Sequence, residues 1–266
     1  MGGAGALAVA LPATGHAQPL FPDAAEPAGA VLFADEFDGP PGAPPDPARW
    51  TVATARETIR NPAFWDRPEN MGQYRDDRQN VFLDGNSNLV IRATREALPE
   101  GLKYFSGKLT GNWRGGIGHT WEARIKLDCL IPGCWPAWWM LNDLPGQGGE
   151  IDVLEWFGNG TWGPGSTVHT KLDGTSAANH PIEVDNEWHT WRCQWDVTGI
   201  RFWKDPMPGM PPYFEVPAGS MAQWRFNDPG FQMWPVLNLA VSGSGGGDPA
   251  PGVYPAEMRV DYVRVW

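Results

Sequence analysis

Apolar and polar residues alternate in many short stretches of this chain, which is the pattern of β-strands with one buried face. Residues 120–127 are a clear example, because Trp, Ala, Ile and Leu occupy every second position. Gly, Pro, Asn and Asp separate one stretch from the next, and no apolar repeat of helical period extends beyond a turn or two. We therefore predict an all-β protein whose strands form a sandwich or a barrel.

The predicted strands follow one another along most of the chain. The pair Asp84-Gly85 stands between two of them and favours a tight hairpin turn. Residues 61–78 are polar and irregular, and we expect a loop there that borders a groove. The strands are expected at 31–37, 50–52, 80–83, 88–93, 105–110, 120–127, 135–141, 149–155, 167–172, 187–197, 200–204, 236–241 and 258–266.

Three carboxylates are concentrated in residues 149–156, Gly-Glu-Ile-Asp-Val-Leu-Glu-Trp. The β-branched residues between the acids favour a strand, in which Glu150 and Asp152 point to one face. In a regular strand Glu155 would point to the opposite face. One extra residue at 153–154, a β-bulge, returns Glu155 to the side of the other two acids, and bulges are common beside active sites. We therefore expect a bulge here.

Three acids on one face repel one another, so they do not all ionise together at neutral pH. This repulsion separates their pKa values into acid and base roles, which is useful in a catalyst and a liability in a core. No Lys or Arg occurs between residues 127 and 170, so no cation nearby in the sequence neutralises the acids. Tryptophans at positions 135, 138, 139, 156 and 162 favour a catalytic site over the alternative, a solvated acidic edge strand.

Charge and composition narrow the class of partner. The 266 residues carry a formal charge of -11, which argues against nucleic acid and anionic membranes as partners. The same acidity disfavours a sulfated, polyanionic substrate. Sixteen Trp against five Tyr is a surplus of flat rings that suits a sugar-binding groove, although some of them belong to the core.

The first 30 residues differ from the rest of the chain. Residues 4–13 are small and apolar, and Gly15-His16-Ala17 resembles a small-x-small cleavage site. We expect a signal-peptide remnant and a flexible segment over 1–30, with an Ala/Gly tail of no targeting role as the alternative. No composition break follows, so 31–266 is expected to be one domain. We expect a soluble monomer that is secreted or exported to the cell envelope.

The cysteines and histidines show no metal-binding pattern. Cys129 and Cys134 flank a turn-forming Leu-Ile-Pro-Gly insert and are placed to close a small disulfide loop. Cys193 is then expected as a small buried side chain. The five His lack the spacing of zinc ligands, and the chain has no P-loop, nucleophile elbow or dinucleotide-binding fingerprint. We expect no cofactor in catalysis.

Several blocks of residues accompany the E-x-D-x-x-E motif of 150–155. They are Asp35-Glu-Phe-Asp38, Ser106-Gly107, Trp121–Leu127, Trp135–Leu141, Leu237–Ala240 and Val260–Val265. In their order and content, over nearly all of 31–266, they resemble glycoside hydrolase family 16, in particular its laminarinase-like branch. The resemblance implies a β-jelly-roll sandwich of two curved antiparallel sheets, with the catalytic strand in the concave sheet and a substrate groove.

The resemblance implies hydrolysis of a glycosidic bond with retention of configuration. Glu150 matches the nucleophile, Asp152 the assisting acid and Glu155 the general acid/base. The physical requirements agree, because retention needs two carboxyls roughly 5–5.5 Å apart and a protonated acid needs a raised pKa. The bulged spacing matches laminarinases, agarases, porphyranases and carrageenases, and differs from the E-x-D-x-E of lichenases.

The resemblance also implies residues for substrate binding and for a metal. The substrate-binding positions correspond to Trp135, Trp139, His169 and Asn238. A buried structural role is the alternative for His169, and Trp138 is expected to face the core. Some members carry a structural calcium near the first and last strands, where Glu36 and Asp261 are the matching candidates. Two acids alone supply fewer oxygens than calcium requires.

The substrate class is open between three alternatives. We favour an endo-acting hydrolase of neutral β-glucan, above all β-1,3-glucan of the laminarin type. A galactan hydrolase of the agarase type is the second alternative. A catalytically inactive β-glucan-binding lectin is the third, but such relatives lose the motif glutamates, which are all present here. The Gly-rich segments 159–166 and 242–247 depart from the family, and loops of this kind set substrate choice.

Overall fold

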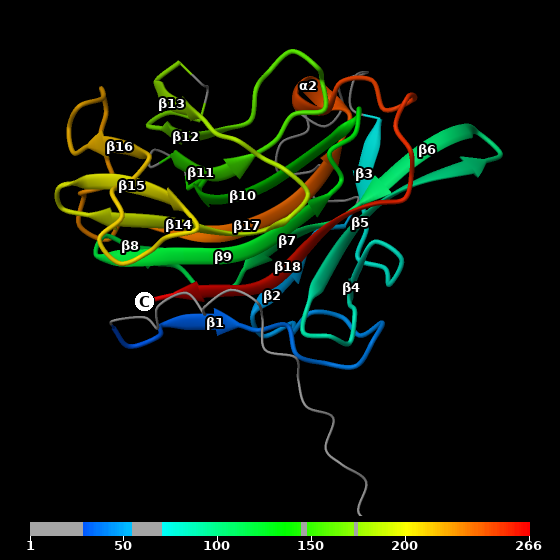
Figure 1. Ribbon diagram of the computed structural model, residues 1–266, viewed down its shortest axis with the longest axis horizontal. Coiled ribbons are helices and arrows are strands. Elements are labelled where there is room, and N and C mark those ends of the chain that lie inside the picture. Colours follow the sequence, from blue (N-terminus) through cyan, green and yellow to red (C-terminus); the bar gives the residue numbers. More distant parts are fainter. Residues whose placement is uncertain (1–28, 55–70, 145–147, 173–174) are drawn as a thin grey trace, which may run out of the picture.

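Two large β-sheets build the protein, as the alternating pattern predicted (Figure 1). The computed structural model describes residues 29–54, 71–144, 148–172 and 175–266. Nearly all neighbouring strands are antiparallel, and the jelly-roll sandwich expected from the family resemblance is confirmed. Within these ranges no helix is long and apolar enough to cross a membrane. The proposed signal remnant and part of the predicted loop at 61–78 lie outside the described residues.

The first sheet has ten strands and includes both ends of the described chain. β1 (Phe33–Asp35) pairs with β18, and β4 (Val81–Leu83) pairs with β5 across the predicted hairpin turn, where Gly85 has a φ of 84°. The other strands follow in the order β16 (Phe214–Pro217), β15 (Gly199–Lys204), β14 (Trp188–Asp196), β9 (His119–Asp128), β18 (Ala256–Val265), β5 (Leu89–Leu98), β6 (Gly101–Ser106) and β3 (Gly72–Tyr74).

The second sheet has eight strands. β8 (Gly115–Gly116) pairs with β17 at one end of that strand. The main order is β13 (Ala177–Pro181), β12 (Gly165–His169), β11 (Gly149–Glu155), β10 (Cys134–Asn142), β17 (Gln232–Val241), β7 (Lys108–Gly111) and β2 (Trp50–Val52). The acidic stretch predicted as a strand is therefore β11, which lies between β10 and β12 (Figure 1). Helix α2 (Gly243–Gly246) is a single turn after β17.

Two sequence predictions about the strands are corrected by the sheets. Residues 72–74 were expected in a loop but form β3, which gains a parallel hydrogen-bonded partner in β6. The strand predicted at 105–110 divides at Gly107 into β6 and β7, which belong to different sheets. A Cβ at Gly107 would lie 2.2 Å from Cγ2 of Val81, so only glycine fits at this crossing.

The hydrophobic core lies between the sheets and receives the face that the alternation predicted. The four apolar residues of 120–127 are all buried there. Trp138 is fully buried in this core, as predicted, and so are Trp121, Trp191 and Trp195. Part of the tryptophan surplus therefore stabilises the fold by burial of large apolar surfaces and is not available for a ligand.

The predicted disulfide loop is wrong. All three cysteines are free and buried thiols. The loop between Cys129 and Cys134 is closed instead by backbone hydrogen bonds, because Ile131 N donates to Cys129 O at 2.8 Å and Cys134 N donates to Ile131 O at 3.1 Å. Burial raises the pKa of Cys134 to about 12, so its thiol stays protonated. Cys193 is a small buried side chain, as expected.

Candidate active site

A β-bulge in β11 places the three carboxylates on one face. The pairing with β10 changes register between Trp138 and Trp139, and the pairing with β12 shifts between Asp152 and Glu155. Val153 and Leu154 are both fully buried in the core. The bulge therefore buries two consecutive apolar side chains, whereas a regular strand would bury one of them and expose the other. The predicted bulge is confirmed. We call the outer surface of β10–β12 that carries the acids the carboxylate face.

Contacts with a histidine and a tryptophan hold the acids together. Glu150 stands opposite His169 in the pairing of β11 with β12. His169 Nε2 lies 3.3 Å from Asp152 Oδ2 and 3.9 Å from Glu150 Oε1. Trp135 Nε1 donates a hydrogen bond of 3.0 Å to Glu155 Oε1. Two of the four predicted substrate-binding residues, Trp135 and His169, therefore contact the acids directly.

Burial raises the pKa of all three carboxyls, and repulsion by a neighbouring acid adds to the rise for Glu150 and Asp152. For Glu150, burial raises the pKa well above its ordinary value, and the charge of Asp152 raises it further. For Asp152, burial and the charge of Glu155 act in the same direction. Burial raises the pKa of Glu155 to about 7, although the Trp135 N–H and the charge of His169 oppose this rise. Glu155 is therefore able to hold or release a proton near neutral pH.

The other two predicted substrate-binding residues also lie on the carboxylate face. Trp139 Nε1 donates to Asn238 Oδ1 at 2.7 Å. Asn238 on β17 pairs with Ala137 on β10, and Ala137 pairs with Glu155 on β11. The amide and the acid therefore lie in the same row of side chains across the sheet. The hydrogen bond fixes the Trp139 ring beside Asp152, with which Trp139 pairs across the strands. That Trp139 and Asn238 contact the substrate stays a prediction.

The sequence has no cation near the acidic motif, but the sheet brings one toward the acids from a distant strand. Lys108 stands opposite Asn238 in the pairing of β7 with β17. Its Nζ lies 5.7 Å from the centroid of the Trp139 ring, and its charge lowers the pKa of Glu150. Lys108 lies 42 positions before Glu150 in the sequence, and the family block Ser106-Gly107 directly before it is the signal that marks its strand.

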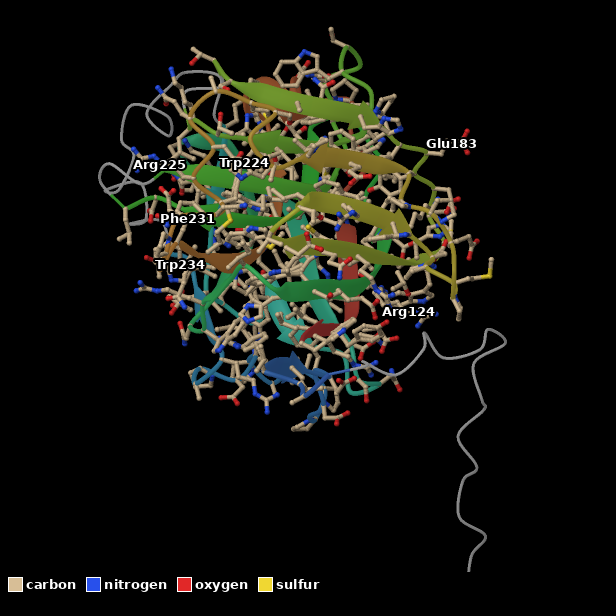
Figure 2. All side chains as sticks on the ribbon, turned by 90° about the vertical axis from the view of Figure 1, so that its left-hand side faces the viewer. Arg124, Glu183, Trp224, Arg225, Phe231 and Trp234 are labelled. Carbon is tan, nitrogen blue, oxygen red and sulfur yellow. The ribbon has the colours of Figure 1, made fainter. Side chains whose placement is uncertain are left out.

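Trp234 was also missed by the sequence analysis. It stands opposite Leu141, and Leu141 stands opposite Glu150, so the ring extends the row that begins at the acid. The Arg114 guanidinium carbon lies 4.5 Å from the Trp234 ring centroid. Figure 2 shows Trp234 on the same side of the molecule as Trp224 and Phe231. Its strand was predicted to begin only at residue 236, which left Trp234 outside the pattern.

The candidate calcium ligands do not fit a calcium ion. Both oxygens of Glu36 accept hydrogen bonds from Arg264, at 2.9 and 2.8 Å. Asp261 pairs with Arg124. Each carboxylate is thus neutralised by an arginine, and the two do not belong to a shared group of metal-ligating side chains in the described part of the chain. Among the described residues, Glu150, Asp152 and His169 form the one group of three side chains whose possible metal-binding atoms all lie within 4.8 Å of one another.

The arrangement supplies the groups that acid-assisted hydrolysis of a glycosidic bond requires. Glu155 is a carboxyl that can be protonated near neutral pH, and Glu150 is a second carboxyl on the same face. Two such groups can share one reaction, in which one donates a proton to the leaving oxygen and the other attacks carbon.

Comparison with known proteins agrees with this chemistry. The profile of glycosyl hydrolases family 16 matches residues 70–210. The crystal structure of a putative β-glucanase from Mycobacterium abscessus is 63% identical and covers 89% of this chain and 100% of that chain, with a TM-score of 0.84. A structure of an immunostimulatory antigen and pseudo β-1,3-glucanase of Mycobacterium tuberculosis is 60% identical and covers 90% of this chain and 99% of that chain, with a TM-score of 0.83.

A β-glucanase of Rhodothermus marinus is 30% identical over 89% of this chain and 84% of its own length. The family profile, these relatives and the two-sheet fold agree with the arrangement of acids on β11. The chain therefore belongs to glycosyl hydrolase family 16.

Proposed function

We propose that this protein is an endo-acting hydrolase that cleaves β-1,3-glucan with retention of configuration. The observation that carries the proposal is the bulged strand β11, which holds Glu150 and Glu155 on one face and leaves Glu155 with a pKa of about 7. An acid with this pKa is matched to proton transfer near neutral pH. Retention requires a second carboxyl, in the ionised form, on the other side of the bond that is cleaved.

In the first step Glu155 donates its proton to the glycosidic oxygen while a Glu150 oxygen attacks the anomeric carbon. The bond between that carbon and the oxygen breaks, the shortened chain leaves as an alcohol, and a glycosyl ester remains on Glu150. In the second step the Glu155 carboxylate takes a proton from water, and the water oxygen displaces Glu150 from the anomeric carbon. Asp152 lies between the two and shares a proton with Glu150, which eases its departure.

Glu150 must be ionised to attack, although burial and Asp152 raise its pKa. The charges of His169 and Lys108 act against that rise and favour the carboxylate form. Lys108 lowers the pKa of the nucleophile Glu150, the Trp135 N–H lowers the pKa of the acid Glu155, and the charge of His169 lowers the pKa of both. The surroundings of the two glutamates therefore differ, as their separate roles require.

A neutral glucan is the substrate best supported. The formal charge of -11 repels polyanionic polysaccharides. Relatives named a β-1,3-glucanase from Mycobacterium marinum and a β-glucanase from Rhodothermus marinus support a glucan. Binding of β-glucan without hydrolysis is a second candidate, because the Mycobacterium tuberculosis relative is described as a pseudo β-1,3-glucanase. The presence of all three acids favours hydrolysis.

A reducing-sugar assay on laminarin, lichenan, agarose and carrageenan tests the proposal. We expect product from laminarin, and proton NMR of the first product should show the β-anomer before mutarotation. Glu150→Gln and Glu155→Gln should nearly abolish turnover and leave the protein folded, as cooperative thermal unfolding will show. Full activity in either variant would exclude the mechanism. Laminarin binding without product in the unchanged protein would support the second candidate.

A further inference from the structure

An unbroken series of aromatic rings leads from the proposed acid to solvent. The series starts at Trp135, whose N–H is bonded to Glu155. The Trp135 and Phe157 ring centroids are 5.7 Å apart, and those of Phe157 and Trp162 are 5.4 Å apart with the planes at 85°. Trp162 is 49% exposed, whereas the core tryptophans are fully covered. An indole held in this way is an accessible apolar surface beside the reacting groups.

Hydrogen bonds hold the outer ring of this series in place. The backbone N–H groups of Thr161 and Trp162 both donate to Asn159 Oδ1 at 2.9 Å. Asn159 Nδ2 donates to Ser244 O at 2.8 Å, and Asn159 N donates to Gly245 O at 3.0 Å. The connection between β11 and β12 is thus fastened to α2, which lies next to it in Figure 1. A ring fixed before binding costs less entropy when a ligand arrives.

The two Gly-rich segments that depart from the family meet at this point. A Cβ at Gly245 would lie 2.4 Å from Cδ2 of Trp135. Gly247 has a φ of 69°, and its Cβ would lie 2.9 Å from the Cα of Asn159. Glycine is therefore required for α2 to approach both the inner ring and the loop that carries the outer ring. Together the two segments support the aromatic series.

We propose that Phe157 and Trp162 bind the sugar residues on the leaving-group side of Glu155, an inference that rests on the proposed hydrolysis. The sugar that is attacked must lie over Glu150. Glu155 protonates the oxygen that joins this sugar to the next one. Along β10, Leu141 pairs with Glu150 and Ala137 with Glu155, so Trp135 lies beyond Glu155 on the side away from Glu150, and the other rings continue from it. We call Trp135, Phe157 and Trp162 the aromatic platform.

The chemistry of the platform selects an uncharged sugar. Residues 156–166 contain no Asp, Glu, Lys or Arg, so the surface offers rings and backbone groups and no charge to pair with sulfate or carboxylate. Flat rings contact the C–H face of a β-glucopyranose, whose axial hydrogens form an apolar patch. A neutral β-linked glucan meets this requirement.

The test compares Trp162→Ala with Trp162→Phe and with a matched control. The control is Trp188→Ala on the ten-stranded sheet, where the ring lies 5.0 Å from the Arg124 guanidinium carbon, whereas the carboxylate face belongs to the eight-stranded sheet. Steady-state kinetics are measured on laminarin and on a 4-nitrophenyl β-laminaribioside, whose leaving group is a phenol without sugar. Affinity for laminarihexaose is measured by calorimetry with the same variants.

We expect Trp162→Ala to raise KM for laminarin and weaken laminarihexaose binding by roughly tenfold, the size of one important contact at an interface. Its kcat/KM on the nitrophenyl glycoside should not change. Trp162→Phe should recover most of the affinity, and Trp188→Ala should behave as the unchanged protein. Equal KM and affinity in Trp162→Ala and the unchanged protein would overturn the platform.

Failure of the proposed function gives a different result. If the unchanged protein releases no sugar from laminarin or nitrophenol from the glycoside, hydrolysis is refuted and the calorimetric comparison alone decides about the platform. A tenfold weaker affinity in Trp162→Ala would then support a glucan-binding role of the rings, and equal affinity would exclude it.

Discussion

Replacing Trp135 by Phe removes one indole N–H and keeps an aromatic ring at the same position. The lost group donates to Glu155 Oε1 at 3.0 Å and stabilises the ionised form of that acid. Without it the pKa of Glu155 must rise above its present value of about 7. The protonated form then persists to higher pH, so the alkaline limb of kcat/KM should move upward.

The size of the shift follows from the strength of the bond. Hydrogen bonds to charged groups contribute about 1.5–3 kcal/mol, and the lower end applies because Glu155 is partly accessible. Since about 1.4 kcal/mol corresponds to one pKa unit, the limb should move by about one pH unit. The profile of kcat/KM on laminarin measures it, because this ratio reports the ionisation of the free enzyme.

Trp139→Phe is the matched control, because its indole N–H donates to Asn238 and not to a carboxylate. Its alkaline limb should stay in place, even if KM changes. The role of the Trp135 hydrogen bond would be refuted if the limb of Trp135→Phe stayed fixed or moved to lower pH. An equal shift in both variants would also refute it.

Two further changes test the nucleophile and the fold. His169→Gln removes a positive charge that lowers the pKa of Glu150, so the acidic limb of kcat/KM should move to higher pH; a limb that moves down would contradict the assigned charge. Gly107→Ala places a Cβ 2.2 Å from Val81 Cγ2 and should lower the unfolding free energy by about 1–3 kcal/mol in urea denaturation. Gly163→Ala, with open space around its Cβ, should not, and equal losses would contradict the packing at Gly107.

Predictions from near neighbours in the sequence agree well with the fold. The alternation in 120–127 depends only on the two-residue period of a strand, and its apolar face is buried as expected. The hairpin at Asp84-Gly85 is set by the conformational freedom of glycine within one turn. The bulge followed from two local facts, the spacing of the acids and the apolar pair between them.

Predictions that depend on distant partners were incomplete or wrong. Lys108 reaches the acids only because β7 and β10 both pair with β17, and no spacing in the sequence encodes that order. Glu36 was a candidate for calcium by its block in the family, but it pairs with Arg264 across the junction of β1 and β18. Charges find their partners across strands, so a carboxylate viewed alone does not reveal its neighbour.

The sequence by itself determined the all-β class, the strand that carries Glu150, Asp152 and Glu155, and the bulge that aligns them. These features arise from periods and spacings of a few residues, which the backbone converts directly into faces. Only the tertiary structure decided that two Gly-rich segments meet behind Trp135. It also decided the partners of each acid, because strand order and register are fixed by packing of the whole core and not by any single stretch.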